Sequence, residues 1–413
     1  MGLHRRELLQ GMCAGAAALQ VGMTVVASAD QSTGGSSAPN IVMIVPDDLG
    51  WHDVGYHGSR IQTPNIDGLA DGGVRLEQHY VNPTCSPTRV GLLTGRNPAH
   101  YGVHGPLGKN LPVSPEEMHL PLALQEMGYR THIVGKWHLG DRPQCRPLNY
   151  GFDTSYGYLR GQIDPYTHRY KFGDYVTWHR NDEFIEERGH VTDLITEEAV
   201  RRIEKAGDQP FFLYLCHHTP HYPLNEPPAW IEPYEDVFDD VWRQHFAGAV
   251  THMDHGIGQV LDALERTGQR ENTLVVFVSD NGGQKSWGSP EGQYNGRYAA
   301  HTSLGNNTPL RGWKAQLYEG GIRVPTLANW PGKLPAGGTV EAPTRMTDWA
   351  PSFIRLAGAE PESEWQLEGR DLVPLMRGET EPSERSQFYW NHAGRARERM
   401  NGTKNYLDEP VED

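Results

Sequence analysis

The 413-residue sequence lacks lysine- or arginine-rich runs, long apolar stretches, internal repeats and coiled-coil heptads. Its 52 acidic residues outnumber its 37 basic residues, so the formal charge is −15. A protein that binds nucleic acid through the phosphate backbone needs a basic face, so this class is not expected. The missing apolar stretches likewise exclude an integral membrane protein. What is left is a globular chain whose 37% hydrophobic content allows a sizeable core.

The N-terminal segment has the features of a signal peptide. Arg5 and Arg6 precede a mildly apolar stretch, and an Ala-x-Ala cleavage site occupies residues 27–29. Paired arginines are typical of twin-arginine export signals, although an amphipathic first helix is the alternative. We therefore expect a signal peptide over residues 1–29, a linker over residues 30–38, and a mature protein that is periplasmic or secreted.

Cysteine is scarce, with four in the whole sequence, and three of them follow the signal peptide: Cys85, Cys145 and Cys216. An oxidising compartment permits a disulfide. Cys145 and Cys216 are the pair that is left if Cys85 is used chemically. Cys216 also ends an apolar run, which is typical of a buried free thiol. The sequence leaves both alternatives open.

Four short apolar runs are each followed by polar residues, as buried parallel strands are when their carboxyl ends open into a site. These predicted strands cover residues 40–45, 131–134, 211–215 and 273–278. Helical periodicity lies between them, at residues 120–127, 193–206 and 245–267. Strands that alternate with helices predict an α/β fold with a doubly wound, largely parallel sheet. Such sheets bind ligands at the carboxyl ends of their strands.

Two acidic pairs follow the first and the last of these strands. They are Asp47 with Asp48, and Asp280 with Asn281. Either pair alone is more often part of a turn or a helix cap. Together, three carboxylates and an amide oxygen form a set of hard ligands that suits Ca²⁺ or Mg²⁺. The sequence therefore predicts a metal site at this edge of the sheet.

A further motif has the form Cys-x-Pro-x-Arg at residues 85–89, followed by Thr-Gly-Arg at residues 94–96. It resembles the signature of the formylglycine-dependent (type I) sulfatases. Gly-Lys-Trp-His-Leu-Gly at residues 135–140, His-Thr-Pro at residues 218–220 and the lysine segment at residues 309–314 are similar to other elements of that family. The motifs occur in the order that the family has.

This resemblance implies an alkaline-phosphatase-like fold and sulfatase activity. In the family, a maturation enzyme oxidises the cysteine, here Cys85, to formylglycine (3-oxoalanine), whose aldehyde is hydrated. One hydroxyl of the hydrate attacks sulfur, and the second lets the sulfated intermediate collapse back to the aldehyde. The resemblance also implies one Ca²⁺, with Mg²⁺ as the alternative, held by Asp47, Asp48, Cys85, Asp280 and Asn281.

The resemblance further implies roles for the cationic and titratable residues. Arg89 and Lys136 stabilise the hydrated aldehyde, and His138 takes a proton when the sulfated intermediate collapses. Lys314 and His218 contact the sulfate and the leaving oxygen, and His218 is the candidate general acid. A sulfate ester needs positive charge around its oxygens and a proton for the departing alkoxide. The histidine next to it in the sequence, at position 217, is a rival for this role.

The substrate is less well defined. Residues 151–159, 246–254 and 280–284 resemble the arylsulfatase B (N-acetylgalactosamine-4-sulfatase) type. This implies a sulfated carbohydrate, such as a 4-sulfated N-acetylgalactosamine unit, or an aryl sulfate. The polar, aromatic residues 292–307 are either a surface loop or a sugar-binding element. A formylglycine-dependent phosphodiester or phosphonate monoester hydrolase of the same superfamily is the alternative function.

The resemblance covers residues 39 to about 380. After residue 330, proline and glycine punctuate short segments without a clear period. We therefore expect a catalytic domain over residues 39–330 and a smaller C-terminal α+β subdomain over residues 331–413. Members of this type usually end with a further small antiparallel sheet, so the subdomain looks abbreviated.

Overall fold

The computed structural model describes residues 38–171, 175–288, 293–300, 304–380 and 387–392. The predicted signal peptide lies outside these residues, as does the predicted linker apart from its last residue. Residues 393–413 of the predicted C-terminal subdomain also lie outside them.

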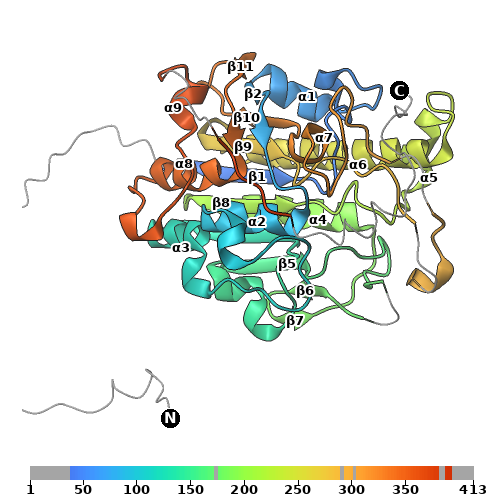
Figure 1. Cartoon of the computed structure of the whole chain (residues 1–413), viewed down its shortest axis with the longest axis horizontal. Coiled ribbons are helices and arrows are strands. Elements are labelled where there is room, and N and C mark those ends of the chain that lie inside the picture. The colour runs from blue at the N-terminus through green and yellow to red at the C-terminus, as the bar shows by residue number, and fades with distance from the viewer. Residues whose placement is uncertain (1–37, 172–174, 289–292, 301–303, 381–386, 393–413) are drawn as a thin grey trace, which may run out of the picture. The chain divides into compact units, whose positions relative to one another are not determined.

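A ten-stranded sheet runs through the described part of the chain (Figure 1). In spatial order its strands are β11 (Gly338–Val340), β2 (Val74–Leu76), β10 (Thr326–Asn329), β9 (Thr273–Val278), β1 (Asn40–Val45), β8 (Phe211–Cys216), β4 (Arg130–Lys136), β5 (Thr154–Tyr158), β6 (Trp178–Arg180) and β7 (Glu183–Phe184). The five strands from β9 to β5 are parallel. Antiparallel strands join them at both sides, β10 against β9 and β6 against β5. A separate parallel pair consists of β3 (His79–Tyr80) and β12 (Thr344–Arg345).

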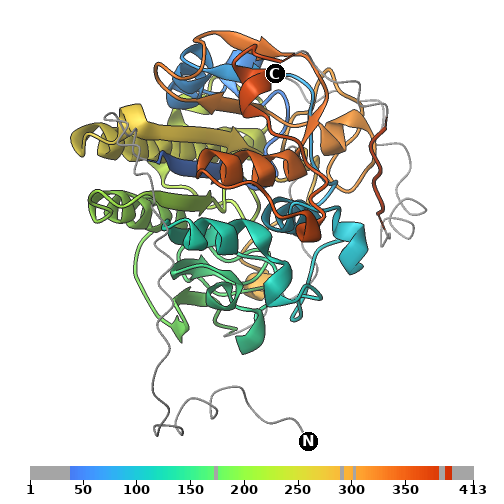
Figure 2. The same cartoon turned by 90° about the vertical axis from the view of Figure 1, so that its left-hand side faces the viewer.

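Helices cover both faces of this sheet (Figures 1 and 2). The helices are α1 (Pro64–Asp71), α2 (Cys85–Thr94), α3 (His119–Glu126), α4 (Val191–Glu204), α5 (Pro228–Ile231), α6 (Val241–Arg266), α7 (Glu319–Ile322), α8 (Trp349–Leu356) and α9 (Val373–Met376). Apolar residues of α2, α3, α8 and α9 share one hydrophobic core, and those of α1, α4 and α6 share the other. No described helix is both long and apolar enough to cross a membrane.

Strand β1 explains why the apolar runs are continuous. Ile41 and Met43 point into the core beside α2 and α3, whereas Val42 and Ile44 point into the core beside α4 and α6. Because successive side chains of a strand alternate between the faces, a strand covered on both sides must be apolar at every position. All six residues of β1 are accordingly buried.

The predicted α/β class and its largely parallel sheet are confirmed by this topology. All four predicted strands and all three predicted helices are present. The largest difference is at the start of α6, which begins at Val241 rather than at residue 245, where Asp240 caps the helix through the backbone N–H groups of Trp242 and Arg243. Strands β11 and β7 at the two edges, and their neighbours β2 and β6, have two or three residues each, too short to give a periodic signal.

The residues after position 330 share the sheet and the core of the preceding part. Strand β11 pairs with β2. The buried side chains of Trp349 and Phe353 in α8 belong to the same hydrophobic core as those of α2 and α3. Among the described residues, position 331 therefore marks no change of core. The division into two domains stays a prediction.

The structure describes Cys85, Cys145 and Cys216 as buried free thiols. Cys216 ends β8, and burial raises the pKa of its thiol to about 11. For Cys145 and Cys216, the free buried thiol is therefore the alternative that the structure supports.

Strand β4 gives a stability prediction at Gly135, whose φ of +104° is unfavourable for other residues. A Cβ atom there would lie 1.8 Å from the carbonyl oxygen of Cys216 in β8, so the two strands would have to separate. We expect Gly135→Ala to lower the free energy of unfolding by about 3 kcal/mol or more. Gly128→Ala is the matched control, because its φ is +83° but nothing lies within 4 Å of the added atom. It should cost only about 1 kcal/mol of backbone strain. Equal losses in denaturant titrations would contradict the proposed crowding.

Candidate active site

Polar residues that follow four parallel strands meet at one edge of the sheet, as expected for carboxyl-terminal strand ends. Strand β1 leads into Asp47 and Asp48, and β9 leads into Asp280 and Asn281. Strands β4 and β8 lead to residues 136–138 and 217–218. The N-terminus of α2 and the loop before α7 supply the other predicted residues, Cys85, Arg89 and Lys314. Hydrogen bonds and ion pairs connect these residues.

The acidic residues form a buried cluster in which none is more than 2% exposed. The Asp48 backbone N–H donates to Asp280 Oδ1 at 3.3 Å, and the Asn281 amide donates to Asp48 Oδ1 at 2.8 Å. Within the described part of the chain, Asp47 Oδ1 and Asn281 Oδ1 are buried acceptors that receive no hydrogen bond. Buried acceptors of this kind normally have a partner. Their carboxylate and amide chemistry fits a hard cation such as Ca²⁺ or Mg²⁺.

The pKa values of two carboxyl groups in this cluster shift in opposite directions. Burial raises the pKa of Asp47 well above its usual value, because nearby Asp280 and Asp48 add to desolvation and Lys136 offsets only part of it. Burial also acts on Asp280, but Arg89 and the neighbouring lysines outweigh it and hold the pKa below its usual value. A cation bound at this cluster would favour the charged form of Asp47 as well.

Three buried or nearly buried cations face the acidic cluster. Lys136 contacts Asp47, and Lys314 Nζ lies 2.6 Å from Asp48 Oδ2. Arg89 donates through Nη2 and Nε to Asp280 Oδ2 at 2.9 and 3.2 Å. A third bond runs from Arg89 Nη1 to the carbonyl oxygen of Lys136 at 2.8 Å, which ties α2 to β4. Burial would lower the pKa of Lys314, but Asp48 raises it above the usual value, so its ammonium stays charged.

Cys85 is the first residue of α2, and its Sγ lies 3.0 Å from His138 Nδ1. Its sulfur also belongs to a group of candidate metal ligands with Asp47 and Asp280, whose ligand atoms lie within 4.8 Å of one another. His138 has a φ of +55°, an uncommon conformation that the Ser86 hydroxyl stabilises by donating to its carbonyl oxygen at 2.8 Å. Burial, followed by Lys136 and Arg89, lowers the pKa of His138 well below its usual value. A neutral imidazole therefore faces position 85.

His218 is held by Tyr158, whose hydroxyl lies 3.2 Å from His218 Nδ1. His218 Nε2 is buried and makes no hydrogen bond to any described residue. Burial, followed by Lys136, lowers the pKa of His218 to about 3. The pKa of His217 is also lowered to about 3, but after burial its electrostatic neighbour is His252 rather than a residue of the cluster. This geometry favours His218 over His217 as the histidine that faces the cluster.

Two residues at this edge carried no expectation from the sequence. His221 Nε2 lies 3.7 Å from Asp48 Oδ2, and its Nδ1 lies 2.6 Å from the carbonyl oxygen of Tyr222. It is the second histidine of the His-Thr-Pro-His segment, so its place three residues after the predicted general acid His218 was the available signal. Tyr158 ends the buried strand β5, where an apolar pattern does not distinguish a core tyrosine from one that positions a catalytic group.

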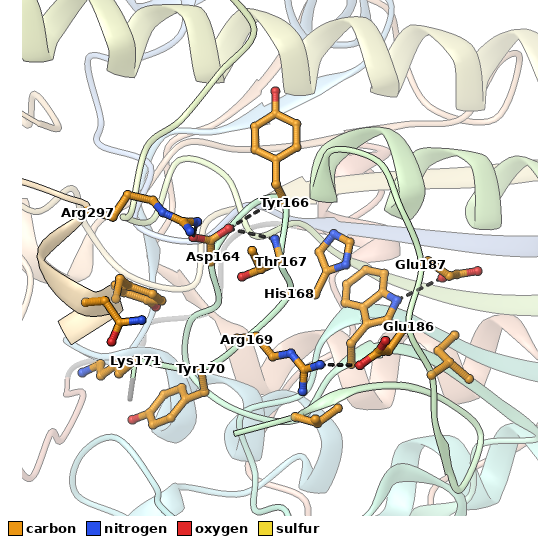
Figure 3. A pocket seen from close by; sticks show the side chains of 15 residues that line it. Asp164, Tyr166, Thr167, His168, Arg169, Tyr170, Lys171, Glu186, Glu187 and Arg297 are labelled. Atoms are coloured by element: carbon orange, nitrogen blue, oxygen red, sulfur yellow. Dashed lines mark hydrogen bonds and ion pairs between the residues drawn. The ribbon is translucent and has the colours of Figure 1, made fainter. Parts of the chain in front are cut away.

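A cavity of about 400 Å³ is lined by residues from the segments 164–171, 176–187 and 294–297 (Figure 3). Arg297 Nη1 donates to Asp164 Oδ2 at 2.6 Å on one side of it, and Arg169 pairs with Glu186 on the other. Burial dominates the low pKa of His138, and Lys171 on the cavity wall lowers it further. The charge of Lys171 on the cavity wall therefore acts on the pKa of a residue of the candidate site. Of the predicted residues 292–307, those at 294, 295 and 297 line it.

The chain was compared with known proteins. The family model described as Sulfatase matches residues 39–359. The chain belongs to the sulfatase family. This confirms the family that the cysteine motif indicated, across more than three quarters of the sequence.

Individual relatives agree with this assignment. Mouse arylsulfatase J is 35% identical over 357 residues, which are 83% of this chain and 56% of that protein. Dog N-acetylgalactosamine-6-sulfatase is 33% identical over 384 residues, which are 87% of this chain and 70% of that protein. The chain thus spans little more than half the length of arylsulfatase J. These relatives do not single out the arylsulfatase B type, which stays a prediction.

A solved structure supports the fold of this sulfatase. The crystal structure of Ps i-CgsB in complex with k-i-k-neocarrahexaose is 35% identical, with a TM-score of 0.75. The match covers 84% of this chain and 77% of the other. The predicted alkaline-phosphatase-like α/β fold, with a mixed and largely parallel sheet between helices, is therefore confirmed.

The Arg89–Asp280 pair gives a prediction that a double-mutant cycle can test. Both side chains are at most 1% exposed, so removal of either partner leaves a buried group unpaired. We expect Arg89→Met alone to lower the free energy of unfolding by about 3–5 kcal/mol. The double variant with Asp280→Asn should lose less than the sum of the two single losses. Strict additivity in denaturant titrations of all four proteins would contradict the coupling.

Proposed function

We propose that this protein hydrolyses sulfate esters and that position 85 carries the nucleophile after oxidation of Cys85 to formylglycine. The observation that carries the proposal is the position of Cys85. It opens α2 beside His138 and shares a buried group of ligand atoms with Asp47 and Asp280. Burial raises the pKa of the Cys85 thiol, so the unmodified side chain is a poor thiolate nucleophile. A function for this cysteine therefore calls for its conversion.

Two groups would complete the site. The formylglycine would supply a hydrated aldehyde as the nucleophile. A cation, Ca²⁺ or alternatively Mg²⁺, would polarise the sulfate and offset the charge of the transition state. The oxygen atoms suited to hold this cation belong to Asp47, Asp48, Asp280 and Asn281. The orphaned acceptors among them support this part of the proposal.

The cationic side chains of the site suit a sulfate group. Lys136 is fully buried and Lys314 is 11% exposed, so both present charge where water screens it little. In the proposed mechanism Lys314 contacts the sulfate oxygens, while Lys136 and Arg89 stabilise the side chain of residue 85. Fixed positive charge of this kind acts on the charge that develops at the oxygens of the transition state.

Two histidines divide the proton transfers. His138 is neutral and its Nδ1 faces position 85, so it can accept a proton from that side chain. His218 would donate to the leaving oxygen from Nε2, because its Nδ1 is engaged by the Tyr158 hydroxyl, whose oxygen accepts from Nδ1–H when the imidazole is charged. A bound sulfate ester adds negative charge that opposes Lys136 and raises the pKa of His218. Substrate binding would therefore favour protonation of the general acid.

The proposed substrate is a sulfated carbohydrate. The polar cavity in Figure 3 offers carboxylates, arginines and tyrosines, which hydrogen-bond hydroxyl groups and pack against sugar rings. The complex of Ps i-CgsB with k-i-k-neocarrahexaose and the name of the dog relative point to the same class. Within it, we propose a 4-sulfated N-acetylgalactosamine unit as the first candidate. The 6-sulfated isomer is its direct competitor, and aryl sulfates are expected as simpler substrates.

We also propose that the protein is exported to the periplasm or secreted and that a formylglycine-generating enzyme acts on Cys85. The twin arginines at positions 5 and 6 and the cleavage site at 27–29 support export. Peptide masses of the protein purified from the periplasm and the medium would test both points. A start near residue 30 and the mass of formylglycine at position 85 are expected.

The central test measures sulfate and phosphate release from protein whose conversion at Cys85 has been verified by peptide mass. The substrates are an aryl sulfate, 4- and 6-sulfated N-acetylgalactosamine, sulfated oligosaccharides and a phosphodiester. We expect sulfate release from a sugar, and we expect a Ca²⁺ chelator to abolish it because the acidic cluster then lacks its cation. Dominant phosphate release would instead support the phosphodiester or phosphonate hydrolase.

Cys85→Ala removes the proposed nucleophile. We expect sulfate release to fall by about 10⁴-fold or more, while sugar binding changes little. Cys145→Ala is the matched control, since it removes another buried thiol outside the site. Full activity of Cys85→Ala, measured against the control, would contradict the role of position 85.

Tyr158→Phe tests how His218 is oriented. The variant keeps the ring but loses the hydroxyl that meets His218 Nδ1 at 3.2 Å. We expect kcat to fall by about tenfold with little change in KM, and the limb of the pH–rate profile that reports the general acid to shift. An unchanged profile would show that Tyr158 only fills space.

A further inference from the structure

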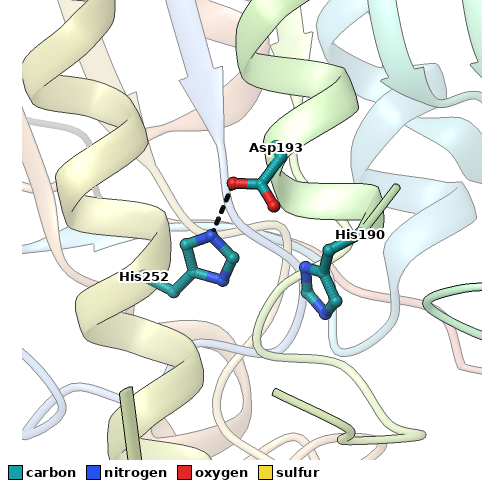
Figure 4. A group of neighbouring side chains, drawn as sticks. All are labelled: His190, Asp193 and His252. Atoms are coloured by element: carbon teal, nitrogen blue, oxygen red, sulfur yellow. Dashed lines mark hydrogen bonds and ion pairs between the residues drawn. The ribbon is translucent and has the colours of Figure 1, made fainter. Parts of the chain in front are cut away.

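A second group of buried titratable residues lies away from the acidic cluster and shares no residue with it. His190 caps α4, Asp193 lies in the first turn of that helix, and His252 faces them from α6 (Figure 4). Glu226 approaches from the loop before α5. His190, His252 and Glu226 are buried, whereas the Asp193 side chain is 52% exposed. The group therefore has a solvent-accessible side.

The distances bring nitrogen and oxygen donors together. His252 Nε2 lies 2.9 Å from Asp193 Oδ1, and His252 Nδ1 lies 2.6 Å from Glu226 Oε2. One ligand atom from each of His190, Asp193 and His252 falls within 4.8 Å of the other two. The two imidazole rings stack with centroids 5.0 Å apart, and Trp230 covers the other face of His252 at 4.7 Å. The rings are thus held in place by packing as well as by hydrogen bonds.

One nitrogen of this group lacks a hydrogen bond. His190 Nε2 is buried and receives or donates none among the described residues, and it lies 3.4 Å from Glu226 Oε1. His190 Nδ1 accepts a long hydrogen bond of 3.3 Å from the backbone N–H of Thr192. A metal on Nε2 would leave the ring proton on Nδ1, so the ring would exchange this weak bond for the metal. A buried, unpartnered ring nitrogen beside two carboxylates is an unusual cost unless something binds to it.

We propose that His190, Asp193, Glu226 and His252 form a binding site for one divalent cation of the zinc type. Two imidazoles and two carboxylates are the donors that Zn²⁺ prefers, whereas Ca²⁺ prefers oxygen alone. Asp193 and the two imidazoles provide direct ligands. Glu226 either completes the set or holds His252 through Nδ1, as carboxylates commonly do behind metal-bound histidines.

The site would link three segments near the catalytic edge. His190 caps α4, Asp193 lies in that helix and His252 lies in α6, while Glu226 comes eight residues after His218 in the same loop. A bound cation would fix this loop against both helices, where the Thr192 and Thr219 hydroxyls already meet at 3.0 Å. Its role is therefore structural support of the loop and independent of the proposed reaction.

A proton is the competing occupant of this group. Burial alone would lower the pKa of His252, but hydrogen bonds to Asp193 and Glu226 raise it to about 9. A protonated His252 between two carboxylates satisfies these three groups and leaves His190 Nε2 without a partner. The two occupants predict different stoichiometries of bound metal.

The experiment counts Zn²⁺ bound to chelator-treated protein in saturating Ca²⁺, which occupies the acidic cluster. A Cys85→Ser background removes the thiol of the catalytic edge, which is the other strong Zn²⁺ donor there. We expect one equivalent of Zn²⁺ by isothermal titration and by elemental analysis. His190→Gln and His252→Gln should each weaken this binding by at least about tenfold. With Co²⁺ as the probe, the parent protein should give the visible spectrum of a histidine-bound ion, and His190→Gln and His252→Gln should not.

His255→Gln is the matched control, because it removes an exposed imidazole on the same helix that contacts Trp230 and Gln259 instead. It should bind Zn²⁺ as the parent does. Circular dichroism of each variant checks that it is folded. Absence of Zn²⁺ binding in the parent protein would overturn the proposal. So would Zn²⁺ binding by the His190 and His252 variants that is as tight as the binding by the parent. Either result leaves the proposed sulfatase reaction untouched, since no readout is an activity.

Discussion

Compensation of buried charge is the constraint on which the candidate active site depends. Three carboxylates lie there at no more than 2% exposure, and an unpaired buried carboxylate costs several kcal/mol. Each has its own cation, in the pairs Lys136–Asp47, Lys314–Asp48 and Arg89–Asp280. The acids follow β1 and β9, while the cations come from β4, α2 and the loop before α7. Charge balance therefore holds five separate segments in one arrangement.

The parallel strands bring these segments together, and their close approach sets a second limit. Gly135 in β4 lets the backbone of β8 pass at a distance that no side chain allows, and Lys136 follows directly. The close approach of the two strands therefore fixes the backbone of Lys136, whose side chain contacts Asp47. Arg89 donates a hydrogen bond to the Lys136 carbonyl oxygen, so its position is tied to that of the lysine backbone. The placement of the Lys136 ammonium thus depends on a backbone contact between β4 and β8. The motifs of the site do not predict this contact.

Much of this architecture could be predicted because buried parallel strands are continuous apolar runs and their polar ends carry the chemistry. That reasoning found the four strands and the residues Asp47, Asp48, Asp280 and Asn281 that follow two of them. The other six predicted site residues came from the resemblance to the sulfatase motifs, and the structure brings all ten to one edge of the sheet. It missed Tyr158 because a tyrosine in a buried strand looks like core. It missed the group around His190 and His252 because its members are separated by up to 62 residues and each resembles an ordinary helix residue. Their proximity is a product of how α4 packs on α6, which periodicity does not specify.

The chemistry of position 85 connects modification to cation binding. Ca²⁺ and Mg²⁺ prefer oxygen, whereas a thiol is a soft donor, and burial keeps the Cys85 thiol protonated by raising its pKa. The cysteine is therefore a poor match for the carboxylate oxygens that share its group of ligand atoms. Oxidation to formylglycine replaces sulfur by oxygen at the same place and makes all the donors hard. In the proposed function, the unmodified chain would accordingly hold the proposed cation less firmly than the converted one. A single oxidation would then supply both the nucleophile and the last ligand of that cation. The histidines of the second group have no such dependence, which is why the two sites are expected to select different ions within one fold.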